Sequence, residues 1–100
     1  MTKEEKRDLI VSITTNLYYT YYLHKPPYQD GEGGEFYLSE IEKTDKWLYE
    51  DWKFSEIPDY RVRYEVENAG WSFLVEVEHN GVWKIIYDHT NKIEAPNWLD

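Results

Sequence analysis

Residues 60–88 read YRVRYEVENAGWSFLVEVEHNGVWKIIYD and contain the strongest secondary-structure pattern of the chain. Apolar and polar side chains alternate there in three runs, and turn-forming residues separate the runs. Alternation with period two is typical of strands that bury one face. The pattern predicts a three-stranded antiparallel meander over about residues 60–88. Its apolar positions are Tyr60, Val62, Tyr64 and Val66, then Trp71, Phe73, Val75 and Val77, then Trp83, Ile85 and Tyr87.

The second turn sets the register of the last two strands, because a slip of one residue moves an apolar set to the opposite face. A two-residue turn at Asn80 and Gly81 would place Val77 opposite Lys84. We therefore predict a three-residue loop over residues 79–81, with Gly81 in the left-handed bulge position. This loop pairs Glu78 with Val82, Val77 with Trp83, Val75 with Ile85, Phe73 with Tyr87 and Glu76 with Lys84.

The first hairpin fits a four-residue loop over residues 67–70. The predicted pairs are Val66 with Trp71, Tyr64 with Phe73, and Arg61 with Glu76. One face of the meander is then wholly apolar and has to be covered by another layer. The other face is expected to carry Arg61, Arg63, Glu65, Glu76, Glu78 and Lys84 around a small patch of Leu74 and Ile86.

The N-terminal segment has the signature of a helix start. Thr2 and Glu5 have the spacing of a capping box, and apolar residues then recur at helical spacing. We expect a helix over about residues 3–23 that ends before Pro26 and Pro27. A strand remains the alternative for residues 9–23, because β-branched and aromatic residues also alternate there.

A second helix is predicted over about residues 40–53, because Ser39 and Glu42 repeat the capping-box spacing and Pro58 bars its continuation. The glycine-rich acidic residues 28–35 are expected to form a loop. Trp98 in the tail is expected to pack back on the body. The chain is thus predicted to be one α+β domain, residues 1–100, whose two helices cover the apolar face of the meander.

Composition restricts the classes of partner. The chain has 100 residues, 20 of them acidic and 11 basic, and its formal net charge is −9. This charge disfavours direct binding to nucleic acid or to an anionic membrane, and it favours basic partners. There is no cysteine, and neither a signal peptide nor a membrane span fits the sequence. We expect a cytoplasmic protein; the oligomeric state stays open.

The acidic residues are concentrated in one segment, residues 30–59, which holds ten acidic and three basic side chains. Seven of the nine net negative charges therefore lie in less than a third of the chain. A partner-binding strip for a basic surface and a solvated face kept for solubility both fit this pattern. The candidate partner-binding carboxylates are Asp30, Glu32, Glu35, Glu40, Glu42, Asp45, Glu50, Asp51, Glu56 and Asp59.

A cluster of tyrosines at the end of the first predicted helix covers too much of its circumference to be wholly buried. Exposed tyrosine beside carboxylates is typical of protein interfaces. We add Tyr18, Tyr19 and Tyr22 to the candidate partner-binding residues. The alternative is that the tyrosines pack against the sheet and the Pro26-Pro27 segment.

The sequence gives little support for catalysis or for a bound metal. Residues 30–35 resemble a calcium loop in composition, but the loop pattern requires Gly at its sixth position and Glu at its twelfth. Glu35 and Ile41 occupy those positions. Asp88 beside His89 is the single adjacency of interest for acid–base chemistry, and no known catalytic motif is present. We expect no enzyme, no metal site and no cofactor.

The leading hypothesis is a small acidic protein that binds and blocks a basic surface of another protein, above all a nucleic-acid-binding one. In size, charge, lack of cysteine and aromatic content, the chain is similar to the small acidic inhibitors that bacteriophages and mobile elements direct against DNA-binding proteins. A DNA mimic of this kind presents carboxylates in place of phosphates. The alternatives are a small-molecule binding module with an aromatic-lined cleft, and an immunity or antitoxin-type protein that neutralises a basic toxin.

Overall fold

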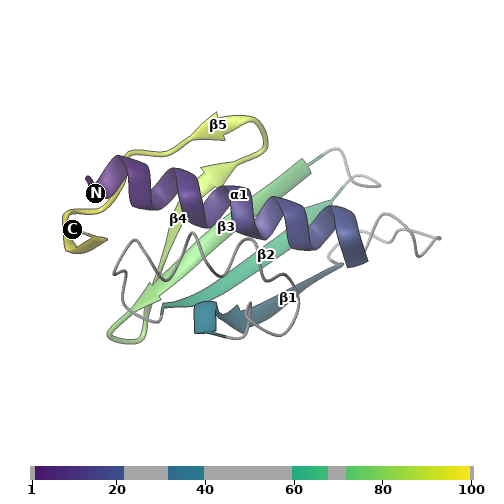
Figure 1. The fold of residues 1–100 in the computed structure, drawn as a ribbon, viewed down its shortest axis with the longest axis horizontal. Helices are drawn as coiled ribbons and strands as arrows, with labels where there is room; N and C mark the ends of the chain where they lie inside the picture. Colours follow the sequence, from purple (N-terminus) through teal and green to yellow (C-terminus); the bar gives the residue numbers. More distant parts are fainter. Residues whose placement is uncertain (1, 22–31, 40–59, 68–71, 100) are drawn as a thin grey trace.

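A computed structural model describes residues 2–21, 32–39, 60–67 and 72–99. These residues form an antiparallel sheet with one helix, α1, lying across one of its faces (Figure 1). The α+β class, the N-terminal helix and the antiparallel sheet are confirmed. The sheet, however, has five strands and not three. The elements are α1 (Lys3–Tyr21), β1 (Glu32–Tyr37), β2 (Arg61–Glu67), β3 (Ser72–His79), β4 (Val82–Asp88), β5 (Asn91–Lys92) and a short 3₁₀ helix, η3 (Asn97–Leu99).

Within the described ranges α1 is the single α-helix, and the second helix predicted over residues 40–53 falls outside them. The sheet order is β1-β2-β3-β4-β5, so each strand pairs with its neighbours along the chain. The strands run side by side behind α1, with β1 at one edge (Figure 1). Described strands that follow one another in the chain are therefore neighbours in the sheet, and each neighbouring pair is antiparallel.

The capping box predicted at the start of α1 is present. The Thr2 amide donates a hydrogen bond to Glu5 Oε1 at 3.2 Å, and the Glu5 amide donates to Thr2 Oγ1 at 3.1 Å. Further along, Ile10 and Ile13 are fully buried against the sheet. Thr14 is buried as well, and its hydroxyl donates to the Ile10 carbonyl at 2.7 Å, which satisfies its polar atom within the helix. The strand alternative for this segment is wrong from residue 9 to residue 21.

The core lies between α1 and the inner face of the sheet. Val62, Val75 and Val77 are completely buried there, as the alternation predicts. Leu38, Ala95 and Leu99 complete the core from outside the meander. The predicted inward set of β2 and β3 is thus confirmed for the described residues, and Trp71 falls outside them. The inward aromatic and aliphatic residues of these strands are Tyr60, Val62, Tyr64, Val66, Phe73, Val75 and Val77.

The register of the first hairpin differs from the predicted one by two residues. Val66 lies opposite Phe73, and Tyr64 lies opposite Val75. A shift of two positions leaves every side chain on its predicted face, because side chains alternate with period two. The predicted pairing of Arg61 with Glu76 is nevertheless wrong, because Arg63 occupies that place.

The prediction for the second hairpin is wrong. Asn80 and Gly81 form a two-residue turn with φ values of 53° and 79°, and His79 lies opposite Val82. Positive φ at both central residues is the geometry that matches the twist of the flanking strands. The consequence that we used to reject this turn is present: Val77 lies opposite Lys84.

A β-bulge in β4 makes this register compatible with a buried core. Val75 lies opposite Tyr87 and Glu76 lies opposite Ile85, so Ile86 has no partner across the pair. The extra residue changes the alternation beyond Ile86, so that Tyr87 and not Ile86 lies opposite Val75; the exchange of Ile85 and Ile86 follows from the turn itself. Ile86 is fully buried, whereas Ile85 is 42% exposed, the reverse of their predicted places. The predicted pairs of Trp83 with Val77 and of Lys84 with Glu76 are wrong because the two-residue turn already shifts β4 by one residue relative to β3.

Strand β1 includes residues 32–35, which were predicted to be part of a loop; residues 28–31 of that prediction fall outside the described structure. Its two glycines explain why a strand can form there. A Cβ atom built on Gly33 would lie 2.1 Å from the Tyr64 carbonyl oxygen, and one built on Gly34 would lie 2.9 Å from the Tyr64 hydroxyl. Glycine therefore allows the backbone of β1 to approach β2 closely, and it leaves room for the Tyr64 ring beside Gly34.

The C-terminal tail packs on the body, as predicted for Trp98. The Trp98 ring stacks on His79, with centroids 4.6 Å apart and an interplanar angle of 8°, and it meets Tyr60 edge-on at 5.6 Å. The Tyr60 hydroxyl donates to the Trp98 carbonyl at 3.3 Å. Two basic side chains of α1 also hold the tail: Arg7 donates to the Ile93 carbonyl at 2.9 Å, and Lys3 donates to Asn97 Oδ1 at 2.7 Å.

Candidate interaction surface

The face of the sheet opposite α1, which we call the outer face, combines aromatic, aliphatic and charged side chains. Cross-strand partners share a face, so the registers of the four long strands place these side chains in rows. The first row is Tyr37, Arg61, Glu78 and Trp83; the second is Glu35, Arg63, Glu76 and Ile85; the third is Gly33, Glu65, Leu74 and Asp88.

Two arginines of β2 organise the first two rows. Arg63 makes a two-point ion pair with Glu76, with Nη2 to Oε2 at 2.8 Å and Nε to Oε1 at 3.3 Å. Arg61 donates to Glu35 on one side and to Glu78 on the other, the latter at 3.4 Å. The hydrogen bonds to Glu35 and to Glu76 raise the pKa values of Arg61 and Arg63 respectively, so both guanidinium groups are firmly cationic.

The same two guanidinium groups lie over the ring of Trp83. The guanidinium carbon of Arg63 is 4.1 Å from the ring centroid, and that of Arg61 is 5.5 Å from it. Both distances fall in the range of cation–π attraction. Trp83 is therefore fixed by cations that are themselves fixed by carboxylates, which makes the centre of the outer face a preorganised cluster.

The outer face also exposes apolar surface and carries an excess of negative charge. Tyr37 is 46% exposed at the β1 end of the first row, and Ile85 is 42% exposed at the β4 end of the second row. In these three rows, which consist of described residues, five carboxylates, Glu35, Glu65, Glu76, Glu78 and Asp88, stand against two guanidinium groups, so the rows carry a net charge of −3. Apolar side chains set among charges are the composition expected of a protein-binding surface.

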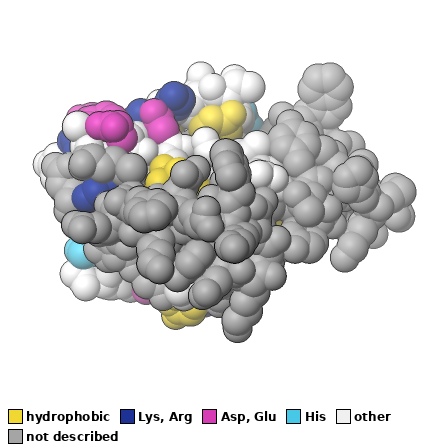
Figure 2. All heavy atoms as spheres, in the orientation of Figure 1, with side chains coloured by type: hydrophobic (Ala, Val, Ile, Leu, Met, Phe, Trp, Pro, Cys, Tyr) yellow, Lys and Arg dark blue, Asp and Glu magenta, His cyan; other side chains and the backbone are white. Residues whose placement is uncertain are grey.

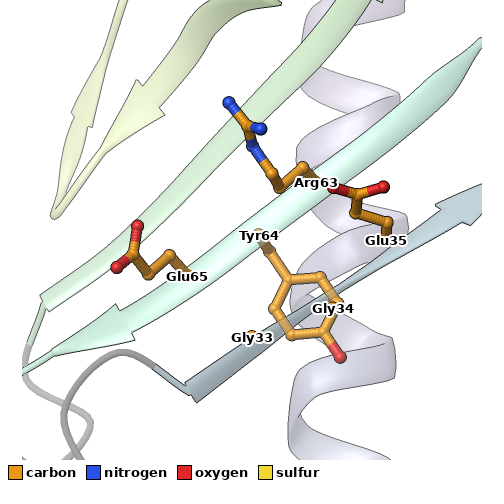
Figure 3. A pocket seen from close by; sticks show the side chains of 6 residues that line it. All are labelled: Gly33, Gly34, Glu35, Arg63, Tyr64 and Glu65. Atoms are coloured by element: carbon orange, nitrogen blue, oxygen red, sulfur yellow. The ribbon is translucent and has the colours of Figure 1, made fainter.

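A shallow hollow of about 250 Å³ interrupts the third row, where Gly33 has no side chain. Figure 3 views the sheet with α1 behind it: Glu35, Arg63 and Glu65 surround the hollow, and the Tyr64 ring lies beside Gly34. The hollow is open to solvent and charged at its rim. These properties suit a long polar side chain of a partner better than an apolar small molecule, which requires enclosure.

On the helix side of the molecule, charges of both signs are mixed. Acidic and basic side chains gather near the N-terminal part of α1 (Figure 2). Asp8 there contacts Arg7 at 3.1 Å and Lys92 of β5 at 3.4 Å. This pairing joins helix to tail and leaves the region without a strong bias toward one sign of charge.

The candidate partner-binding residues are only partly within the described structure. Glu35 is exposed on the outer face and is paired with Arg61. Glu32 lies in β1, and Tyr18 and Tyr19 lie in the last turn and a half of α1. The others fall outside the described residues: Asp30, Glu40, Glu42, Asp45, Glu50, Asp51, Glu56, Asp59 and Tyr22.

Sequence reasoning missed Trp83, Tyr37 and Ile85 as surface residues. Trp83 and Ile85 were assigned to the core because they continue the period-two pattern of β4. The signal that could have found Trp83 and Ile85 is the Asn80-Gly81 dipeptide, the strongest short-range indication of a two-residue turn. Accepting that turn turns Trp83 outward.

The residues considered for acid–base chemistry, Asp88 and His89, lie at the end of β4 and in the turn that follows it. Asp88 and His89 are in contact, with Oδ1 to Nε2 at 3.1 Å, because His89 begins the turn into β5 with a φ of 58°. Within the described ranges no group of three or more His, Asp or Glu side chains is placed to hold a metal ion. α1, the helix described here, is not apolar enough along its length to cross a membrane. Comparisons with protein families, curated proteins and solved structures found no match for this chain.

Proposed function

We propose that this protein is a small acidic inhibitor that binds and covers a basic, nucleic-acid-binding surface of another protein. The observation that carries the proposal is the concentration of charge: residues 30–59 hold seven of the nine net negative charges of the chain. Carboxylates at short intervals compete with phosphates for the same Lys and Arg side chains of a partner.

The outer face supports the same electrostatic reading. Its net charge has the same sign as that of residues 30–59, and Glu35 belongs to both. A basic partner would therefore meet an attractive field from the acidic segment and from the sheet. Such fields accelerate encounter, and salt screens them with a Debye length of about 8 Å at physiological ionic strength.

A pull-down from a lysate of the source cells, at low and at high salt, tests the proposal. Mass spectrometry should identify a basic nucleic-acid-binding protein that is recovered at low salt and lost at high salt. The purified partner should then release a labelled oligonucleotide when this protein is added. A partner that is basic but does not bind nucleic acid would point instead to an immunity or antitoxin role.

Charge-reversal variants test the acidic segment directly. E42K/E50K should weaken binding to the purified partner at least tenfold at low salt. E4K/E94K is the matched control, because it changes the net charge equally at two exposed positions outside the segment. Equal weakening by both variants would mean that net charge alone matters and that residues 30–59 are only a solvated face.

A further inference from the structure

We infer that the outer face, centred on Trp83, is the docking surface for a basic protein partner. An apolar side chain of that partner packs beside Trp83 and Ile85, and its Lys and Arg side chains meet the surrounding carboxylates. The inference rests on the proposed function for the charge of the partner. It adds a second surface, on described residues, to the acidic segment.

The fold places Trp83 on this surface through the two-residue turn between β3 and β4. An uninterrupted β4 in the predicted register would bury Trp83 and Ile85 and expose Ile86. The Asn80-Gly81 turn produces the opposite arrangement, and the bulge at Ile86 then returns Tyr87 to the inner face opposite Val75. The core is filled by Ile86, so the large indole is available to the surface.

Trp83 is also prepared for contact. Arg61 and Arg63 hold its ring, and each arginine is held by a carboxylate, so few side-chain rotations remain to be lost on binding. Interface residues that contribute most to affinity are enriched in Trp, Tyr and Arg. All three types lie within the first row of the outer face, with Tyr37 at its far end.

Charge decides between the possible occupants of the face. A nucleic acid would bring phosphates to a surface of net charge −3 on a chain of net charge −9, and a second copy would bring the same negative face. A basic protein surface is opposite in charge to both the outer face and the whole chain, so it is the occupant that electrostatics favours. The hollow beside Gly33 gives one Lys or Arg side chain room to approach Glu65.

Nuclear magnetic resonance titration of the full chain with two synthetic peptides tests the inference. The first probe is a twelve-residue peptide of alternating Lys and Leu, and the second is alternating Lys and Ser with the same charge. At low salt, the Lys-Leu peptide should shift the Trp83 indole N–H and the amides of Ile85 and Tyr37. The Lys-Ser peptide should shift these signals less.

Two variants remove the apolar centre without touching the core. Both W83T and I85T should weaken the Lys-Leu peptide about 2- to 12-fold, the range for loss of an apolar or aromatic contact, and should change the Lys-Ser peptide little. I93T is the matched control, because Ile93 is 37% exposed and lies in the tail. If W83T fails to fold, I85T alone tests whether the apolar side chains of the outer face contribute to binding of the Lys-Leu peptide.

The outcomes separate this inference from the proposed function. Shifts confined to residues 30–59 with both peptides would overturn the docking surface and leave the acidic segment standing. Shifts on the outer face that E42K/E50K does not weaken would support the docking surface and count against the acidic segment. No shift with either peptide would contradict both.

Discussion

Val77 lies directly opposite Lys84 in the pair of β3 and β4, although Val77 is fully buried and Lys84 is exposed. Two positions away, Val75 lies opposite Tyr87, and both belong to the inner face. Ile86 is the extra residue of β4 between these two pairs. It has no cross-strand partner on β3, and its side chain is buried in the core. Because of the bulge, the hairpin has a two-residue turn and Tyr87 still faces the core opposite Val75.

The register that the Asn80-Gly81 turn imposes predicts different costs for two adjacent isoleucines. I86A should lower the free energy of unfolding by about 2–5 kcal/mol, because it opens a cavity in the core. I85A should cost less than about 1 kcal/mol, because Ile85 is 42% exposed. Urea unfolding of both variants measures the difference. A larger loss for I85A would mean that β4 follows the register of a three-residue loop, in which Ile85 and Trp83 face the core.

The two glycines of β1 should respond differently to alanine. G33A should destabilise the protein by about 1–3 kcal/mol, because the new Cβ would collide with the Tyr64 backbone. G34A should cost less, since its Cβ meets the movable end of the Tyr64 side chain. G34A is thus the control for composition. Equal unfolding midpoints in urea would argue against the close pairing of β1 with β2.

Tyr60 should make stability sensitive to alkaline pH. Burial raises the pKa of its phenol, and the protonated hydroxyl donates to the Trp98 carbonyl. The folded state therefore favours the neutral form, and this contribution is present below about pH 10 and lost as pH rises through the higher folded pKa. Y60F has no proton to lose. Its urea midpoint should fall less than that of the parent between pH 9 and pH 11, and parallel curves would contradict this.

Glu5 should give the opposite dependence in acid. The hydrogen bond from the Thr2 amide, and next the contact with the Thr2 side chain, lower the pKa of the Glu5 carboxyl. Stability from the ionised group is present above its ordinary pKa and is lost as pH falls through the lowered value. E5Q should flatten the dependence of the urea midpoint between pH 5 and pH 3. E4Q, in the same turn, controls for removing one exposed carboxylate; an equal effect would exclude a special role for the cap.

Local patterns predicted α1 and the inward side chains of β2 and β3, because capping and periodicity depend on neighbours in sequence. They failed for β1, where glycines and acids resemble a loop but pair with β2 and pass close to Tyr64. For the candidate site, the sequence located the acidic segment but assigned Trp83 to the core. Whether Trp83 faces the core or the solvent depends on the turn and on which isoleucine fills the core. Both depend on how the helix and the sheet pack in the folded protein.

The amino-acid sequence by itself thus determined the charge, the helix and the apolar face, since these follow from composition and from spacing along the chain. The tertiary structure alone decided where β4 gains its extra residue. Two constraints, a turn that requires positive φ and a core that must be filled, meet at Ile86, and neither can be evaluated without the other strands in place.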